Sequence, residues 1–426
     1  MNGRILWAVL LLATSALSKP AMAATPAFRD FDRRAAAGER LSVVFFGASL
    51  TWGANATDPN LTSYRARLAE RFKERYPKAH FKFFDAAIGG TGSQLGVFRL
   101  DRDVLRRKPD LVFLDFSAND GINSADPESN ASYESLVRRI IRDGRCPVVL
   151  AIFPFKRDAT AAGTSGMARR AAHLALAKAY HTAAADVIAL AQSRIESGEA
   201  SADDLWNTDA VHPGDSGYQL FADVAWQAYL DGVKEAAVCA CPDKMLYADT
   251  YMRQARVRIS SLYATNGLPA GWRGGAPSLT AAWHDGLMSR WLDDLVIASN
   301  WQTARGADGK EDVKSASPAR LAARFSGAMV LLFGEETMKS GRYRVFIDGK
   351  AVTRPAQGGK GTTDLFDASA RQFGGNRQHA QTIATGLATN VEHSLEIEPV
   401  LSADGEQELR LESICVAGGA ALVKAR

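Results

Sequence analysis

Short apolar runs alternate with helical segments between residues 41 and 230. We predict strands at residues 41–46, 81–86, 111–116, 148–153 and 186–190 because each run is almost continuously apolar, as in strands that are buried on both faces. Residues 64–76 place Leu68, Phe72 and Tyr76 four apart among charged residues, which predicts an amphipathic helix. This alternation, over about 190 residues, predicts one α/β domain with helices on both faces of a central parallel sheet.

The pattern changes beyond Cys241. Residues 328–333, 343–347 and 393–398 read as antiparallel strands, and Asp348-Gly349 after the second run is a hairpin-turn dipeptide. We therefore predict a β-sandwich or jelly-roll-like accessory domain over residues 236–426, following an α/β domain over residues 24–235.

The first 23 residues have the pattern of a leader. Arg4 precedes an uncharged, largely apolar run over residues 5–18, and Ala21-Met22-Ala23 has the A-x-A form of a cleavage site. The alternative is a membrane anchor, but the run is shorter than the ~20 residues that a spanning helix needs. We expect a signal peptide at residues 1–23, cleavage near Ala23, and a periplasmic or extracellular protein without stable membrane insertion.

The charge balance bears on the partners that the protein can bind, and the cysteine positions bear on disulfides and metal sites. The chain has 51 Lys and Arg against 47 Asp and Glu, which gives no reason to expect a nucleic-acid or polybasic membrane binder. Cys146 opens an apolar run and is predicted to be a buried free thiol. Cys239 and Cys241 are too close in sequence to form an unstrained disulfide with each other. We therefore expect one of them to form a disulfide with Cys415. The spacing does not indicate a zinc site.

Polar groups follow the predicted strands at their carboxyl ends, where open α/β sheets place ligands. Ser49 follows the first strand, the glycine-rich loop with Gly90 follows the second, and Asn119 follows the third. Asp209 and His212 lie three apart in a turn that enters a predicted helix at residues 218–229. Each feature alone has a structural reading, such as a helix cap for Ser49. Together they predict a carboxylate–imidazole–hydroxyl site for nucleophilic catalysis.

These residues, in this order, resemble the SGNH (GDSL-like) hydrolases over roughly residues 41–230. The resemblance implies a flavodoxin-like three-layer αβα sandwich. It also implies that Ser49 is the nucleophile, with His212 and Asp209 as its base and carboxylate. Ser49, Gly90 and Asn119 are implied to form the oxyanion hole, through two backbone N–H groups and one side-chain amide.

Two positions depart from the family pattern. Where the family has Gly-Asp-Ser-Leu, this chain has Gly47-Ala48-Ser49-Leu50. Where the family has a glycine two residues before the asparagine that corresponds to Asn119, this chain has Ser117. Neither departure removes a group that moves a proton or binds the oxyanion. Asp120, next to Asn119, is interpreted as a turn or helix-cap group.

The other histidines are assigned to surface or core roles. None of the three in the C-terminal region is expected to have a carboxylate and a hydroxyl beside it. The six are His80, His173, His181, His284, His379 and His393.

The family resemblance implies a serine esterase that needs no metal and no organic cofactor. With an exported chain and an accessory β-domain, we expect it to remove O-acetyl groups from a carbohydrate; the domain argument is an analogy of fold. The alternatives are a lipase or arylesterase, an O-acetyltransferase that uses the same residues, and a binding protein on a decayed hydrolase scaffold. The sequence leaves the glycan and the oligomeric state open.

Overall fold

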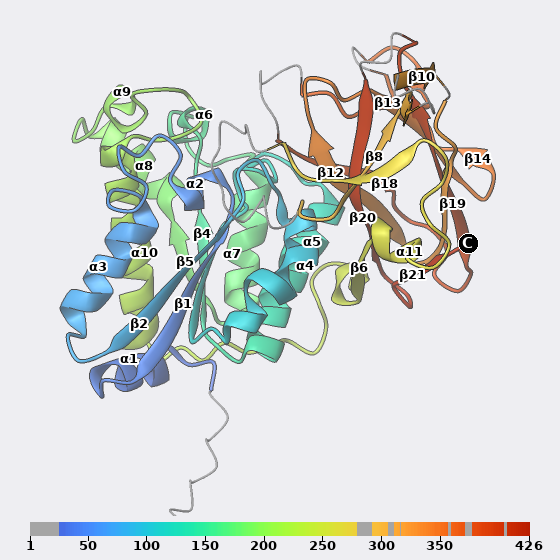
Figure 1. Ribbon diagram of the computed structural model, residues 1–426. Helices are drawn as coiled ribbons and strands as arrows, with labels where there is room; N and C mark the ends of the chain where they lie inside the picture. The colour runs from blue at the N-terminus through green and yellow to red at the C-terminus, as the bar shows by residue number, and fades with distance from the viewer. Residues whose placement is uncertain are drawn as a thin grey trace, which may run out of the picture.

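The computed structural model describes residues 25–278, 292–305, 311–315, 317–356, 359–370, 377–403 and 407–426. An α/β part and a part made mainly of β-strands lie side by side (Figure 1). The predicted leader at residues 1–23 lies outside the described residues.

A parallel sheet forms the middle layer of the α/β part. Its strand order is β2-β1-β3-β4-β5, the order of flavodoxin-like folds. The strands are β1 (Arg40–Gly47), β2 (His80–Ala87), β3 (Leu111–Leu114), β4 (Val148–Ile152) and β5 (Ala183–Asp186). The predicted fold class is confirmed.

The fifth predicted strand is misplaced. Residues 183–186 form β5, and most of the predicted run, from residue 187 on, belongs to helix α8 (Val187–Glu196). The Asp186 carboxylate accepts a hydrogen bond from the Ala189 N–H and caps that helix. The prediction failed because a short apolar run fits a buried helix as well as a buried strand, while the alanines of β5 give little strand signal.

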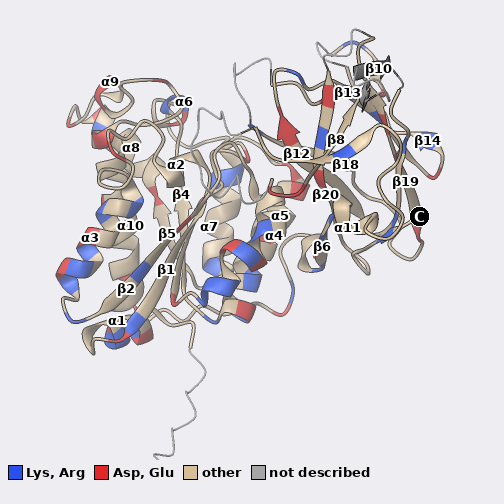
Figure 2. Ribbon diagram, viewed as in Figure 1, with Lys and Arg blue, Asp and Glu red and all other residues tan. Residues whose placement is uncertain are grey.

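Helices cover both faces of the sheet (Figure 1). The predicted helix at 64–76 is confirmed as α3. Charged residues are frequent along these helices, whereas the central strands carry few (Figure 2). One layer contains α1 (Phe28–Ala36), α3 (Tyr64–Arg75), α8 and α10 (Asp215–Lys234), and the other contains α4 (Ser93–Asp103), α5 (Pro127–Arg139) and α7 (Ala168–Tyr180). Shorter helical segments are α2 (Ser49–Trp52), η1 (Leu105–Arg107), η2 (Ile140–Gly144), α6 (Lys156–Ala159), α9 (Ala202–Leu205), η3 (Thr250–Met252) and α11 (Ile259–Leu262).

The C-terminal part contains two antiparallel sheets, each with six strands among the described residues. One contains β11 (Leu321–Ser326), β13 (Arg342–Ile347), β14 (Lys350–Ala351), β17 (Leu365–Asp367), β19 (His393–Val400) and β21 (Leu422–Ala425). The other contains β6 (Gln254–Arg258), β7 (Trp272–Gly275), β8 (Leu295–Ser299), β12 (Met329–Glu336), β18 (Arg377–Ala384) and β20 (Glu408–Ala417). Two small pairs are β9 (Trp301–Arg305) with β10 (Glu311–Ser315), and β15 (Arg354–Pro355) with β16 (Thr362–Thr363).

Both sheets contribute side chains to one apolar core, which confirms the predicted β-sandwich class. The three predicted strand runs correspond to β12, β13 and β19. Asp348 and Gly349 both have positive φ, 52° and 75°, between β13 and β14, as the hairpin dipeptide predicts.

The sheet that contains β12 and β20 also packs on the α/β part. Val330 and Leu332 lie in the sandwich core, whereas Leu331 and Phe333, which point the other way, belong to the same buried cluster as the α/β core. Two hydrogen bonds to residues of α4 border this contact: Thr382 donates to Gln94 at 3.3 Å, and Gln254 donates to Asp101 at 2.8 Å. The central strands β12 and β20 of this sheet are therefore buried on both faces.

All four cysteines are free thiols, so the expected bridge to Cys415 is wrong. Cys239 lies next to the N-terminal segment, where its N–H donates to the Pro26 carbonyl. Cys415 lies on β20, paired with Arg256 of β6. Burial raises the pKa of Cys239 and of Cys415 to about 12, so both stay protonated at neutral pH. The prediction of Cys146 as a buried free thiol is confirmed.

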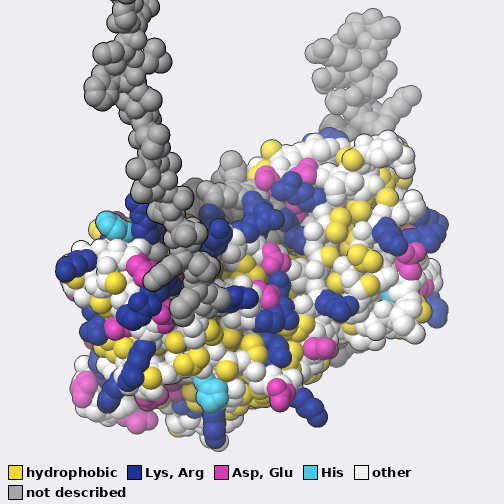
Figure 3. Space-filling model, turned by 90° about the horizontal axis from the view of Figure 1, so that it is seen from below, with side chains coloured by type: hydrophobic (Ala, Val, Ile, Leu, Met, Phe, Trp, Pro, Cys, Tyr) yellow, Lys and Arg dark blue, Asp and Glu magenta, His cyan; other side chains and the backbone are white. Residues whose placement is uncertain are grey.

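Within the described ranges, no helix is long and apolar enough to cross a membrane. On the face seen in Figure 3, basic, acidic and hydrophobic side chains are interspersed.

Candidate active site

The end of β1 positions Ser49. Gly47 closes the strand where a Cβ atom would stand 2.2 Å from the Thr51 Oγ1, so only glycine fits. The chain then turns directly into α2, of which Ser49 is the first residue. The serine is only 6% exposed. This strand–turn–helix places its hydroxyl at the carboxyl edge of the parallel sheet, as predicted.

A turn before α10 brings Asp209 and His212 to the same edge. One oxygen of Asp209 (Oδ1) accepts the backbone N–H groups of Val211, at 2.6 Å, and of His212, at 2.7 Å. The other oxygen (Oδ2) lies 3.1 Å from the His212 Nδ1. The His212 Nε2 lies 3.0 Å from the Ser49 Oγ. The structure thus joins the three predicted residues in one hydrogen-bonded chain.

Asp209 is held as a carboxylate. Its partial burial favours the neutral acid, but the hydrogen bonds from His212, Val211 and Asn55 outweigh burial and lower the pKa of Asp209 to about 2. In the tautomer with a proton on Nδ1, His212 donates to Asp209 and its Nε2 can accept the Ser49 proton. The arrangement suits a serine nucleophile with an imidazole base.

Asn55 is a member of this site that sequence reasoning missed. Its Nδ2 donates to the Asp209 Oδ2 at 2.8 Å, across 154 positions of the chain. Its backbone has a φ of 67°, a conformation that asparagine tolerates better than most residues. The sequence Gly53-Ala54-Asn55 could have indicated a turn, but it holds no signal for the partner of the amide.

The glycine-rich loop after β2 lies against the serine. The Ile88 N–H donates to the Gly47 carbonyl at 3.1 Å, which ties this loop to the end of β1. A Cβ atom on Gly89 would lie 3.6 Å from the Ser49 Cβ, and Gly90 has a φ of 70°. The Gly89–Gly90 peptide is therefore next to the hydroxyl-bearing residue.

Asn119 lies on the turn after β3, which pairs with β1 in the middle of the sheet. Its neighbour Asp120 accepts a hydrogen bond from the Ser93 N–H at 2.9 Å, at the first residue of α4. Asp120 thus caps a helix, as predicted, and links the Asn119 turn to the glycine-rich loop. Burial raises the pKa of Asp120 to about 6, against the hydrogen bonds from Ser93.

A second carboxylate–imidazole–hydroxyl chain lies inside the sandwich and corrects the expectation for His379. The His379 Nδ1 is 2.9 Å from the Glu336 Oε1, and its Nε2 is 2.7 Å from the Tyr343 hydroxyl. Tyr343 is fully buried, and burial raises the pKa of its hydroxyl well above the usual range. This chain satisfies buried polar groups of the core. His393 also has a carboxylate neighbour, Asp348, at 2.7 Å.

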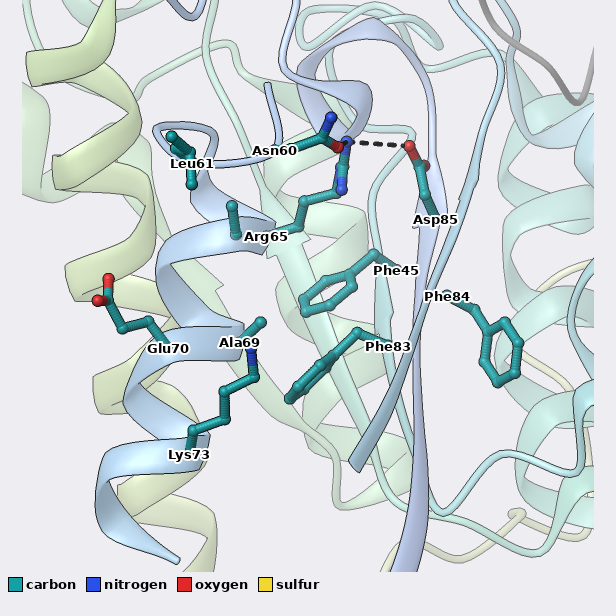
Figure 4. Close-up of a pocket in the computed structure, with 11 residues that line it drawn as sticks. Phe45, Asn60, Leu61, Arg65, Ala69, Glu70, Lys73, Phe83, Phe84 and Asp85 are labelled. Carbon is teal, nitrogen blue, oxygen red and sulfur yellow. Dashed lines mark hydrogen bonds and ion pairs between the residues drawn. The ribbon is translucent and has the colours of Figure 1, made fainter. Parts of the chain in front are cut away.

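A pocket of about 390 Å³ lies between α3 and the strands β1 and β2 (Figure 4). Phe45 and Phe83 form its floor, and the Arg65–Asp85 ion pair, at 3.2 Å, lies at one end. None of Ser49, Asp209 and His212 lines it. Among the described residues, no three His, Cys, Asp or Glu side chains gather as a metal site.

Solved structures resemble the chain in fold. A two-domain esterase (CEX) active on acetylated mannans, co-crystallized with mannopentaose, has a TM-score of 0.66 at 21% identity over 91% of this chain and 93% of its own. Another structure of a two-domain esterase of this kind gives the same TM-score and identity, over 91% and 94%. An acetylxylan esterase from Geobacillus stearothermophilus covers 44% of this chain and 94% of its own, with 19% identity and a TM-score of 0.37. The match to the mannan esterases spans both parts of the chain.

The sequence match to a known family lies in the α/β part. No curated protein is similar to the chain in sequence. The family model described as "GDSL-like Lipase/Acylhydrolase family" matches residues 45–220, which include Ser49, Asp209 and His212. Residues 45–220 are therefore a domain of the GDSL-like lipase/acylhydrolase family.

Proposed function

We propose that the protein is an exported serine esterase that hydrolyses carboxylic esters through an acyl-enzyme and removes O-acetyl groups from a carbohydrate. The observation that carries the proposal is the hydrogen-bonded chain from Asp209 through His212 to the Ser49 hydroxyl. The family match of residues 45–220 supports ester hydrolysis as the reaction.

The reaction begins when the His212 Nε2 takes the Ser49 proton and the Ser49 oxygen attacks the acyl carbonyl. Asp209 stabilises the imidazolium that forms. The negative charge on the carbonyl oxygen is met by the N–H groups of Ser49 and Gly90 and by the Asn119 amide. Loss of one such donor typically lowers the rate by about 10²–10³.

The tetrahedral intermediate then collapses. His212 gives its proton to the leaving alcohol, which departs and leaves the acyl group on Ser49. A water molecule enters, His212 takes its proton, and a second tetrahedral intermediate releases the free acid and the Ser49 hydroxyl. Every proton transfer in this cycle uses protein side chains and water.

The choice of an acetylated carbohydrate follows from the fold comparison. The chain shares its two-part fold with an esterase active on acetylated mannans, which makes a similar substrate a reasonable first choice. Export rests on the leader pattern of residues 1–23.

The test is the turnover of aryl acetate, butyrate and octanoate by the purified protein, with Ser49→Ala as the control. We expect fast release from the acetate, a steep decline with chain length, and no turnover by the variant. A preference for octanoate would replace the proposal with a lipase. Acyl transfer to an added glycan in place of free acid would replace it with an acetyltransferase. A folded protein that cleaves no ester, acetylated mannan and xylan included, would contradict it.

A further inference from the structure

We propose that Gln378, on the accessory sandwich, is a positioning residue that orients the oxyanion-hole peptide of the catalytic domain. The inference rests on the proposed esterase function. It starts from one contact between the two parts of the chain: the Gln378 Nε2 donates to the Gly89 carbonyl at 2.7 Å. The two residues are 289 positions apart.

The register of β18 explains why this side chain reaches the loop. Gln378 pairs with Glu335 of β12, and the next residue, His379, is buried in the sandwich. Because successive side chains of a strand point to opposite faces, Gln378 faces the catalytic domain. On the same strand, Thr382 also reaches the catalytic domain, at Gln94 of α4.

The contacted carbonyl belongs to the peptide that supplies the Gly90 N–H. In a planar trans peptide, the C=O and the N–H point in opposite directions. A donor that fixes the direction of the Gly89 carbonyl therefore fixes the direction of the Gly90 N–H. Gly89 lies between Gln378 and Ser49. Its carbonyl accepts the Gln378 amide, and a Cβ atom on it would be 3.6 Å from the Ser49 Cβ.

This peptide needs an external restraint. Both of its flanking residues are glycines, whose backbones rotate more freely than those of other residues. A peptide between two glycines can therefore turn its N–H away from the substrate. An oxyanion hole works because its donors are already aimed at the position where charge develops. The hydrogen bond also polarises the peptide, which strengthens the N–H as a donor.

The accessory domain is thus part of the catalytic apparatus, although Gln378 itself does not act on the reacting atoms. The consequence is kinetic. Removing the Gln378 amide should lower kcat and leave KM unchanged, because the Gly90 N–H acts on the transition state.

The first test compares Gln378→Met, which keeps the size but cannot donate, with Thr382→Val, which removes the hydrogen bond from β18 to Gln94. We expect Gln378→Met to lower kcat by about fivefold or more, up to the ~10²–10³ of a lost donor, with KM within about twofold. Thr382→Val should retain both values. An equal loss in both variants would show that domain docking matters and would overturn the proposal, as would unchanged kinetics in Gln378→Met. A change confined to KM would assign Gln378 to substrate binding instead.

The second test uses Gln378→Glu, which has nearly the same size. A neutral carboxyl group can donate to the Gly89 carbonyl, whereas a carboxylate cannot. The kcat of this variant relative to wild type should therefore fall as the pH rises from about 5 to about 8. A constant ratio would contradict the proposal. This measurement also covers the case in which Gln378→Met fails to fold.

A third readout separates this inference from the proposed substrate. A fluorophosphonate probe reacts with an activated serine through a charged oxygen in the oxyanion hole, whatever ester the enzyme prefers. Slower labelling of Ser49 in Gln378→Met than in Thr382→Val would support the role of Gln378 even if no acetyl ester is cleaved. Labelling at the wild-type rate in a folded Gln378→Met variant would overturn it. Absence of labelling in the wild type would overturn the serine mechanism itself.

Discussion

Asn55 and His212 share one oxygen of Asp209. The Asn55 Nδ2 donates to Oδ2 at 2.8 Å, and the His212 Nδ1 lies 3.1 Å from the same atom. The other oxygen, Oδ1, is occupied by two backbone N–H groups. The carboxylate is therefore held at both oxygens, and the asparagine sets the plane in which it meets the imidazole.

Replacing Asn55 should weaken catalysis more than stability. A hydrogen bond to a charged group contributes about 1.5–3 kcal/mol, so we expect Asn55→Gly to lower kcat/KM by about tenfold or more. Asn55→Ala should lose the same activity and about 1 kcal/mol of unfolding free energy besides, because alanine is strained at a φ of 67°. Kinetics and urea unfolding of the two variants measure each effect. Equal stability of both, or wild-type activity in either, would contradict this account.

Ser49→Ala should abolish turnover without unfolding the protein. Loss of the nucleophile should lower kcat by at least about 10⁴, since only binding and oxyanion stabilisation remain. The removed hydroxyl bonds His212 at the edge of the sheet, so the melting temperature should change little. Near-full esterase activity in the folded variant would remove Ser49 from the mechanism.

Asp209 should stay ionised throughout the pH range of activity. Its pKa of about 2 means that acidification to pH 4 leaves it charged, so the loss of rate in acid must come from another group. Carbon NMR of the Asp209 carboxyl should show a constant chemical shift from pH 4 to pH 9. We also expect Asp209→Asn to lower kcat by roughly 10²–10⁴, because an amide favours the wrong imidazole tautomer. A carboxyl titration above pH 4 would contradict the prediction.

Asp115 should make the protein less stable as the pH rises. Its buried carboxyl follows β3 and accepts the Thr51 hydroxyl at 2.9 Å. Burial raises its pKa from 3.8 to about 7, partly offset by this bond and reinforced by the charge of Asp120. Between these values the folded protein keeps a proton that the unfolded chain has lost, so the free energy of unfolding falls as the pH rises.

Asp115→Asn removes this titration and keeps an acceptor for Thr51. Relative to wild type it should gain stability between pH 4 and pH 8, by up to about 4 kcal/mol at ~1.4 kcal/mol per pH unit. Denaturant unfolding at several pH values measures the difference. Asp243→Asn, at an exposed site, is the control and should show no such trend. Parallel pH profiles for Asp115→Asn and wild type would contradict the expectation.

Four of the five predicted parallel strands are correct within about two residues because a strand buried on both faces is almost continuously apolar. The fifth strand was misplaced because β5 does not have this pattern. The alanines of β5 are small, and the apolar residues that follow Asp186 suit a helix equally well. The expected cysteine bridge failed for a different reason. The spacing of the cysteines does not show where they lie in space. Only the packing shows that Cys239 lies beside the N-terminal segment, that Cys415 lies on β20, and that both stay unpaired.

The sequence by itself determined the order of the first three strands and the turns after them, and therefore the edge of the sheet at which Ser49, the Gly90 loop and the Asn119 turn lie. Local patterns carry this information because parallel strands expose their carboxyl ends at a common edge. Only the tertiary structure decided which residues support that site. Asn55 reaches Asp209 across 154 positions, and Gln378 reaches Gly89 across 289. An amide side chain has no preferred partner in sequence; it bonds to whatever carboxylate or carbonyl the packed domains bring within about 3 Å.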